Sequence, residues 1–183
     1  MLPPLSDTVA MLERIRTARP MLICLVQIPD QTARELAADL AASQDAELAS
    51  YTLLTRRGVS YLYRSDLVSL QEDSATGMLQ IHTTESQMRI CELLWDSTPS
   101  VETVKAAAAA LKATETEEAT LIISCLAEEN AAVLQTELEN AIPLSAHEAT
   151  QGCYGWGDAL QIQSAKALTE SAALITLQCF AVE

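Results

Sequence analysis

With 183 residues, of which 49% are hydrophobic and 20% charged, the chain has enough apolar surface to fold, so its composition argues against disorder. Its 25 acidic and 11 basic residues give a net charge of −14, which argues against nucleic acid as a partner because phosphate backbones are bound through Lys and Arg. No long apolar stretch and no signal-like start occur, so we expect a cytoplasmic protein that does not contact membranes.

Hydrophobic periodicity and turn residues predict the elements of the first half. Apolar residues at helical spacing indicate helices, an almost continuous apolar run indicates a buried strand, and β-branched and aromatic residues on both sides of Arg56-Arg57-Gly58 indicate a hairpin. In chain order these are a helix over 7–16, a strand over 21–28, a helix over 31–43, hairpin strands over 48–55 and 59–64, a helix over 66–74 and a strand over 78–83.

The second half predicts the same order after a connecting helix over 87–96. Its elements are a helix over 106–112, a strand over 121–126, a helix over 130–140, a hairpin with Gly152-Cys153-Tyr154-Gly155-Trp156-Gly157 at its tip, a helix over 165–173 and a final strand. The tip hexapeptide holds three of the five glycines of the chain.

The two halves also match in sequence at a constant spacing of 98 residues. Residues 69–85 align without a gap on 167–183, with six identical pairs. The same spacing relates the apolar stripes of two predicted helices, through the pairs Ala33/Ala131, Leu36/Leu134 and Leu40/Leu138. One spacing shared by two elements predicts a tandem duplication.

We therefore predict an α+β fold of two tandem βαββαβ (ferredoxin-like) repeats, each preceded by a helix, with antiparallel sheets and the helices on one face. The predicted domains are residues 1–86 for the first repeat with its N-terminal helix, 87–99 for the connecting helix and junction, and 100–183 for the second repeat.

Residues that could carry out catalysis are few. The five cysteines show no CxxC spacing and are interpreted as free thiols, so we expect no metal site and no cofactor. Cys153, His147 and Asp158 could form a thiol nucleophile, but no family signature surrounds Cys153. His82 aligns with Phe180 in the closing strand and is interpreted as a packed residue. We therefore predict no catalytic residues and favour a non-enzymatic role.

Aromatic and arginine residues concentrate in the two hairpin regions, which is the composition of a contact surface. Tyr61 and Tyr63 could equally fill the core, as Leu160 and Ile162 are expected to do in the second half. The predicted contact residues for a ligand or partner are Arg56, Arg57, Tyr61, Tyr63, Arg64, Tyr154 and Trp156.

The function that follows is a binding or regulatory protein that acts through a protein partner or self-association, without nucleic acid. One alternative is a sensor with a small-molecule effector between the repeats. Another is a shell-type assembly protein, because the element order loosely resembles tandem microcompartment shell domains, with Arg64-Ser65-Asp66 at the position of their Arg/Gly-Gly-Asp turn. The helix expected after this turn is much shorter than in that family, and the second half has Gln163-Ser164-Ala165 there.

Overall fold

The computed structural model describes residues 8–26, 28–84, 86–114, 119–124, 126–139, 141–143, 153–156, 160–169 and 172–179. The chain divides into two compact units, Met1–Ser69 and Leu70–Glu183, and each is described by itself. Helices and strands occur in both, so the predicted α+β class is confirmed. None of the helices in the described part of the chain combines the length and apolar composition that spanning a bilayer requires.

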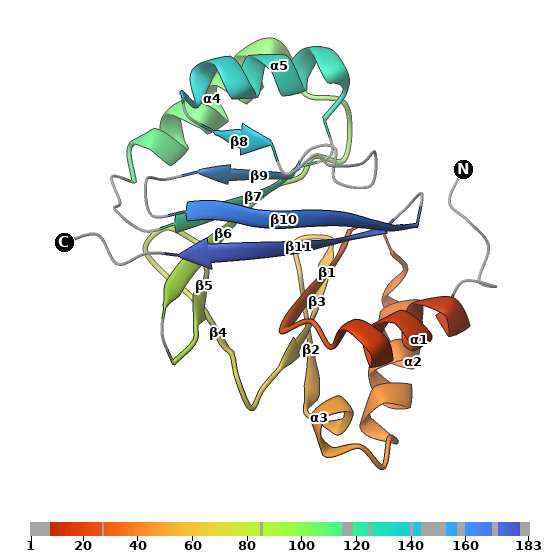
Figure 1. The fold of residues 1–183 in the computed structure, drawn as a ribbon. Coiled ribbons are helices and arrows are strands. Elements are labelled where there is room, and N and C mark those ends of the chain that lie inside the picture. Colours follow the sequence, from red (N-terminus) through yellow and green to blue (C-terminus); the bar gives the residue numbers. More distant parts are fainter. Residues whose placement is uncertain are drawn as a thin grey trace. The chain divides into compact units, whose positions relative to one another are not determined.

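The first unit is a three-stranded sheet with helices packed on it (Figure 1). Its elements are α1 (Thr8–Ala18), β1 (Leu22–Val26), α2 (Asp30–Ala41), α3 (Ala46–Ala49), β2 (Tyr51–Arg56) and β3 (Val59–Arg64). The strand order is β1-β3-β2, and β3 pairs antiparallel with both neighbours. β1 and β2 therefore run in the same direction with β3 between them, which is a split β-α-β arrangement.

The core of this unit lies between the helices and one face of the sheet. α2 contributes the stripe Ala33, Leu36 and Leu40, each at most 1% exposed. From the sheet, Ile23 and Leu62 lie opposite each other in the β1–β3 register and belong to the same cluster. The stripe that the sequence assigns to a sheet-facing helix is therefore confirmed.

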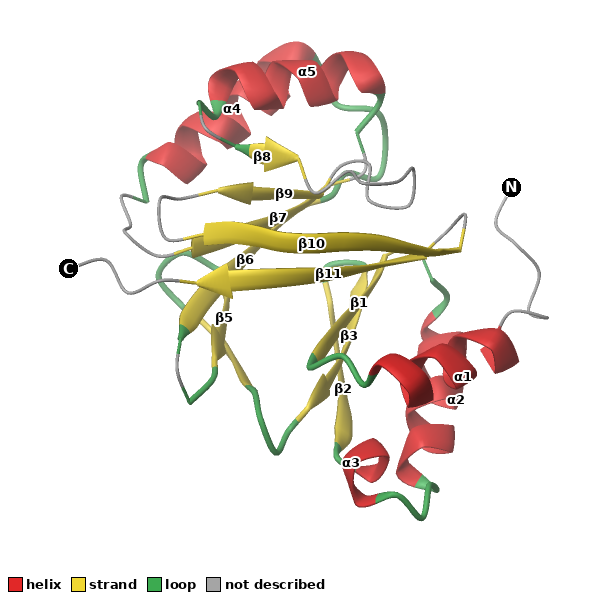
Figure 2. Ribbon diagram, viewed as in Figure 1, coloured by secondary structure: helices red, strands yellow, loops and turns green. Residues whose placement is uncertain are grey.

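The second unit holds a six-stranded mixed sheet and a separate two-stranded one (Figure 2). Its elements are β4 (Ser69–Glu72), β5 (Leu79–His82), β6 (Gln87–Leu93), α4 (Val101–Lys112), β7 (Ala119–Ser124), α5 (Glu128–Glu137), β8 (Ile142–Pro143), β9 (Cys153–Trp156), β10 (Leu160–Thr169) and β11 (Ala172–Cys179). The large sheet has the order β4-β5-β6-β7-β9-β8, and β10 pairs only with β11 in the small one.

One face of the large sheet packs against α4 and α5. Ile122 on β7, Tyr154 on β9, and Val104, Leu111 and Leu134 on the helices form one buried cluster. Ser100 is the N-cap of α4, and its hydroxyl accepts a hydrogen bond of 3.2 Å from the backbone nitrogen of Thr103. Such a cap satisfies one of the amide groups that a helix start leaves without a partner.

The ferredoxin-like prediction is only partly correct. Three strands of the first predicted repeat form, in the order β1-β3-β2. In the second unit β7-β9-β8 has the corresponding order, but β9 consists of residues that the sequence predicts as a hairpin tip. The predicted closing helices do not form in the described chain, and each is replaced by strands. The expectation of purely antiparallel sheets is wrong as well, because β6 and β7 pair in parallel.

The expected helix over 66–74 is a turn followed by β4. Asp66 makes side-chain hydrogen bonds to Arg64 and Ser50 just after β3 ends. Farther on, the Asp73 carboxylate accepts from the Ala75 nitrogen and the Thr76 hydroxyl, and forms a tight turn into β5. Asp and Ser side chains that form hydrogen bonds with nearby backbone groups compete with helix formation. The prediction of a helix considered only the spacing of apolar residues and did not include this competition.

The expected connecting helix over 87–96 is β6, in the interior of the six-stranded sheet. Ile90 and Leu93 fit a helical spacing, but Arg89, Ile90 and Glu92 are all buried, so both faces of the segment are covered. Hydrophobic periodicity alone cannot distinguish a short strand buried on both faces from a buried helix. The chain accordingly divides after Ser69, a different division from the 1–86, 87–99 and 100–183 that the sequence predicts.

In the second half, the expected helix over 165–173 is the end of β10 and the start of β11. The glycine-rich hexapeptide predicted as a hairpin tip provides β9, which lies between β7 and β8. Tyr154, rather than a residue of 160–162, is therefore the cross-strand neighbour of Ile122.

The spacing of 98 residues holds for the helices and fails for the strands. It relates the buried Leu36 and Leu40 of α2 to Leu134 and Leu138, which are also buried. It also relates Cys24 to Ile122, but Ile122 faces the helices, whereas in β1 the helix-facing residues are Ile23 and Leu25. A slip of one residue moves a strand side chain to the opposite face, so an ungapped alignment cannot be the structural one.

Candidate functional site

The tip of the β2–β3 hairpin is a tight two-residue turn. Arg57 and Gly58 both have positive φ angles, 47° and 78°, and Arg56 pairs with Val59 on either side of them. Positive φ at both central residues is the geometry of a type I′ turn, which matches the twist of the flanking strands. Arg57 is exposed at this turn, so the fold presents one guanidinium group from a conformationally restricted backbone.

The opposite end of the hairpin carries a network of ion pairs. Arg19, after α1, lies 2.6 Å from Asp45 and 2.5 Å from Glu47 at the start of α3. Arg64, at the end of β3, lies 2.7 Å from Asp66 and 3.5 Å from Glu47. Two arginines and three carboxylates therefore connect three loops of the first unit, and their charges largely neutralise one another.

Hydrogen bonds reinforce this network. The Tyr51 hydroxyl donates to the Pro20 carbonyl, and burial raises the pKa of Tyr51 to about 12. The Asp66 carboxylate accepts hydrogen bonds from Arg64 at 2.7 and 3.2 Å and from the Ser50 hydroxyl at 2.7 Å. These bonds, together with the charge of Arg64, lower the pKa of Asp66 to about 2. The network is a structural one, because its polar groups are directed at one another.

Five of the seven arginines of the first unit fall into two groups. Arg16, Arg19 and Arg64 are paired with acidic side chains, and Arg16 lies 2.8 Å from Glu13. Arg34 on α2 and Arg57 are exposed, and neither makes an ion pair with any residue that the structure describes. A site that binds an anion needs cations that are not neutralised locally, so Arg34 and Arg57 are the candidates for contact. Of these two, only Arg57 is among the contact residues predicted from the sequence.

The seven predicted contact residues are distributed over both units and differ in their exposure. Arg56 and Arg57 lie at the hairpin tip, whereas Arg64 belongs to the ion-pair network and half-buried Tyr63 lies next to it in β3. Tyr61 and Tyr154 are core residues, at 0% and 3% exposed. Trp156 is half-buried and packs beside the core of the second unit. Arg57 is the only one of the seven that is exposed. Tyr61 is buried because β3 is covered on both faces, as the burial of four successive residues shows.

Sequence reasoning missed the acidic half of the network and Arg34. Asp45 is the N-cap of α3, and its side chain accepts a hydrogen bond of 3.0 Å from the Glu47 nitrogen. The spacing of Asp45 and Glu47 ahead of an apolar residue could have indicated a helix start. Nothing in the sequence indicates that Arg19, 26 residues earlier, lies beside it.

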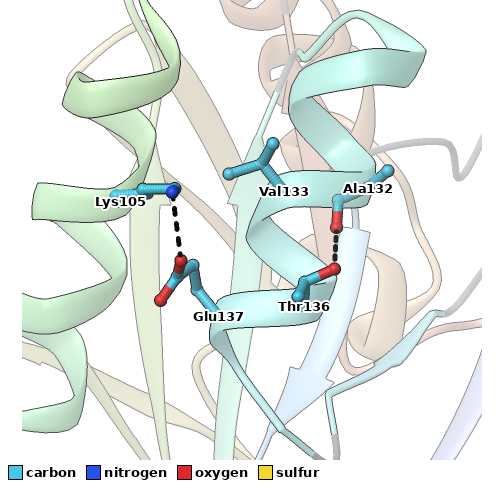
Figure 3. A pocket seen from close by; sticks show the side chains of 5 residues that line it. All are labelled: Lys105, Ala132, Val133, Thr136 and Glu137. Carbon is cyan, nitrogen blue, oxygen red and sulfur yellow. Dashed lines mark hydrogen bonds and ion pairs between the residues drawn. The ribbon is translucent and has the colours of Figure 1, made fainter.

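A shallow hollow lies between α4 and α5 in the second unit (Figure 3). It has a volume of about 260 Å³ and is lined by Lys105, Ala132, Val133, Thr136 and Glu137. Lys105 and Glu137 lie 3.9 Å apart across it, and the Thr136 hydroxyl donates to the Ala132 carbonyl. The polar groups of the hollow are thus directed at other groups of the same two helices, and they offer little to a ligand.

The residues weighed as catalytic are not brought together in the described chain. His147 and Asp158 lie outside the described residues, and of Cys153 only the backbone, in β9, is described. Cys24 and Cys91 are half-buried and are not joined in a disulfide. Among the described residues, no group of three or more His, Cys, Asp or Glu side chains could hold a metal ion.

Comparison with known proteins gives a fold likeness. No protein-family model matches the chain, and no curated protein matches it. The chain is similar in structure to humanized D. rerio TDP2 carrying 14 mutations, with a TM-score of 0.58 and 10% sequence identity over 96% of this chain and 90% of that one. It is also similar to D. rerio TDP2 complexed with single strand DNA product, with a TM-score of 0.50 and 8% identity over 96% of this chain and 78% of that one.

This likeness corrects one expectation from the sequence. The net charge of −14 led us to exclude nucleic acid as a partner, but a protein with a similar fold has been seen with single-stranded DNA. Net charge is a property of the whole chain, whereas phosphate contacts depend on where individual arginines lie. The exclusion of nucleic acid is therefore wrong as an inference from composition.

Proposed function

We propose that this chain is a non-enzymatic binding protein and that its partner is nucleic acid, contacted through the tip of the β2–β3 hairpin. The observation that carries the proposal is the position of Arg57, which is exposed on a type I′ turn and makes no ion pair with any described residue. A guanidinium group held in this way suits the oxygen atoms of a phosphate group. The rest of the first unit supplies the rigid support.

Two further points support a phosphate backbone as the partner. The fold resembles that of D. rerio TDP2, one structure of which is complexed with single strand DNA product. The second point is a further exposed arginine, Arg34, near the start of α2. The last residue of β1 pairs with Val59 beside the hairpin tip, and α2 begins four residues later, so α2 starts at the same end of the sheet as the tip. A site with few arginines predicts weak, sequence-independent binding, with a Kd on the order of 10⁻⁴ to 10⁻⁶ M.

The test is fluorescence anisotropy with a labelled single-stranded DNA of about 12 nucleotides, within the usual range of such sites. The informative variant is Arg57→Asn, because Asn-Gly is the preferred type I′ turn and the fold should keep or gain stability. We expect binding to weaken about fivefold, equivalent to roughly 1 kcal/mol for one lost contact. Unchanged binding by this variant would contradict the proposal.

The matched control is Arg16→Gln. It removes the same charge from an exposed position of the same unit, but Arg16 is paired with Glu13 and lies on α1. We expect its affinity for the oligonucleotide to equal that of the original chain. If both variants lose affinity equally, the effect is one of net charge and the hairpin tip is not the site.

The same samples test whether the role is one of binding alone. We expect the oligonucleotide to be recovered intact after incubation with the protein and with a divalent cation, as judged on a denaturing gel. Cleavage that follows the protein through purification would replace the binding role with an enzymatic one. The sensor and shell-type alternatives stay predictions, because no described feature favours either.

We also propose that the two halves descend from one duplicated unit. Each half contains a helix, a strand and a second helix followed by four strands, with α3 as an addition in the first half. The strand order β1-β3-β2 has its counterpart in β7-β9-β8. Superposing α2 with its neighbouring strands on α5 with its neighbouring strands, with a one-residue shift in the strands, tests this. A failure of the connections to follow the same path would contradict it.

A further inference from the structure

β2 is an edge strand of the first sheet, because it pairs with β3 on one side only (Figure 1). The type I′ turn makes Arg56 and Val59 the closing pair of the hairpin, and such a pair exchanges backbone hydrogen bonds. Bonded and non-bonded pairs alternate along an antiparallel ladder. The backbone N–H and C=O groups of the residues between the bonded ones therefore point away from β3, and these residues are Tyr51, Leu53 and Thr55.

The pairing of β3 with β1 supports this assignment. The Arg64 nitrogen donates to the Met21 carbonyl at 3.0 Å, one residue beyond the paired ends of the two strands. Alternate residues of β3, counted back from Arg64, therefore bond to β1, and the residues between them bond to β2. Among the residues that the structure describes, none accepts from or donates to the outward backbone groups of Leu53 and Thr55.

Residues 51–55 lack the features by which a sequence usually protects an edge strand. Such strands commonly carry Lys, Pro or a β-bulge that prevents pairing with another chain. Here no charged residue and no Pro occurs, and the register with β3 is continuous. Thr52 and Thr55 are exposed, and Leu53 and Leu54 are half-buried. The edge therefore presents open backbone groups beside uncharged side chains.

We propose that β2 pairs antiparallel with β2 of a second copy of the chain, around a twofold axis at Leu53. In this register Leu53 lies opposite Leu53 of the second copy, and Thr55 lies opposite Tyr51 of the second copy. All the outward-facing residues of both strands then exchange backbone hydrogen bonds, and the two three-stranded sheets become one continuous sheet. A twofold interface uses the same surface on both copies, so one open edge is sufficient.

The distribution of charge along β2 favours a second copy as the partner. The hairpin tip carries exposed Arg57, whereas the ion-pair network at the start of β2 contains three carboxylates and two arginines and so keeps one net negative charge. Antiparallel pairing brings the tip of each copy toward α3 of the other, which carries Glu47 of that network. Opposite charges therefore meet at both ends of the interface.

This association does not depend on the proposed function. Nucleic acid would compete with the second copy for Arg57, so association is measured without nucleic acid. An interface of one short strand per copy is smaller than that of a permanent dimer, so we expect reversible association.

The experiment is sedimentation velocity of the full chain over about 5 to 500 μM, where weak dimers form. The salt concentration is about 0.15 M, at which a screening length of about 8 Å limits the repulsion between two copies of net charge −14. We expect the sedimentation coefficient to rise from that of a monomer to that of a dimer. A monomer at every concentration would overturn the proposal.

Thr55→Pro tests whether the strand edge is the interface. It removes an outward N–H group that β3 does not use, and Pro is accepted in edge strands where the N–H faces solvent. The matched control is Thr55→Val, because both variants lose the hydroxyl that lies 3.0 Å from the Ser60 hydroxyl, but only Pro loses the N–H. We expect the control to associate like the original chain and Thr55→Pro to associate at least about tenfold more weakly. Equal association by the two folded variants would place the interface elsewhere and contradict the proposal.

Arg57→Asn tests the antiparallel arrangement with a substitution that the type I′ turn accepts. We expect association to weaken about threefold to tenfold, because a charge is lost at both ends of the interface. Arg16→Gln is the control, since Arg16 is paired with Glu13 on α1, and its association should be unchanged. If Arg57→Asn associates as tightly as this control, the tip does not lie beside α3 of a second copy and the twofold arrangement is wrong.

Discussion

Arg64 donates two hydrogen bonds to Asp66, two residues farther along the chain, from Nε at 3.2 Å and from a terminal guanidinium nitrogen at 2.7 Å. The pair folds the chain back on itself just after β3, where a helix is expected from the sequence. Because the Ser50 hydroxyl also donates to Asp66, the turn is tied to the segment between α3 and β2.

The stability of the first unit should depend on pH through Asp66. Its pKa is about 2 in the folded chain, compared with about 3.9 in an unfolded one. The contribution of the ionised Asp66 carboxylate to the free energy of unfolding is fully present above about pH 4 and is lost as the pH falls through about 2. Thermal unfolding from pH 7 to pH 2 should show that the difference between the original chain and Asp66→Asn stays constant to about pH 4 and then shrinks. A constant difference down to pH 2 would show that the carboxylate is not held as described.

Tyr51→Phe should destabilise the first unit by about 0.5–1.5 kcal/mol, the usual value of a lost hydrogen bond. Tyr51 is 4% exposed, and its hydroxyl donates to the Pro20 carbonyl, so the ring still packs in the variant while the carbonyl loses a donor. Urea unfolding measures the change. Because the folded pKa of about 12 is above the usual value of 10, the phenol's contribution should persist to about pH 10 and be lost as the pH rises through 12.

Leu36→Ala should cost about 2–5 kcal/mol in the free energy of unfolding, because it leaves a cavity between α2 and the sheet. Leu36 is 0% exposed in the core of the first unit. The matched control is Val9→Ala on α1, where the side chain is 69% exposed and the expected change is within about 0.5 kcal/mol. Similar losses in the two variants would contradict the packing described here.

Arg57→Asn should keep or raise the stability of the hairpin, whereas Arg57→Val should lower it. Asn tolerates the positive φ of 47°, but a β-branched residue does so poorly. The difference between the two variants should be about 1–2 kcal/mol, measured by denaturant unfolding. Equal stabilities would mean that the turn is not of type I′.

Local patterns predict most of the first unit. The apolar stripe of Ala33, Leu36 and Leu40 and the Arg57-Gly58 turn are short-range signals, and both identify the elements correctly. The same reasoning fails for residues 87–93, because a strand buried on both faces does not alternate apolar and polar residues. What decides their structure is pairing with β5 and β7, and β7 is 26 residues or more away in the chain.

The candidate site is less predictable than the fold. The sequence singles out Arg57 together with Tyr61 and Tyr154, and only the arginine is exposed. The difference depends on which face of a strand is covered, and composition cannot supply that information. The pairing of Arg19 with Asp45 and Glu47 is also a tertiary contact, and it determines which arginines are left to meet an anion.

The central place of β3 in the first sheet has a consequence for synthesis on the ribosome. β1 and β2 are made first, but neither pairs with the other, and both obtain their hydrogen bonds from β3, which is made last. Until Arg64 has left the exit tunnel, the apolar segment Leu22–Val26 has no strand beside it in this sheet. The nascent chain therefore carries an uncovered, association-prone segment for some 40 residues of translation, a period in which chaperones can bind it.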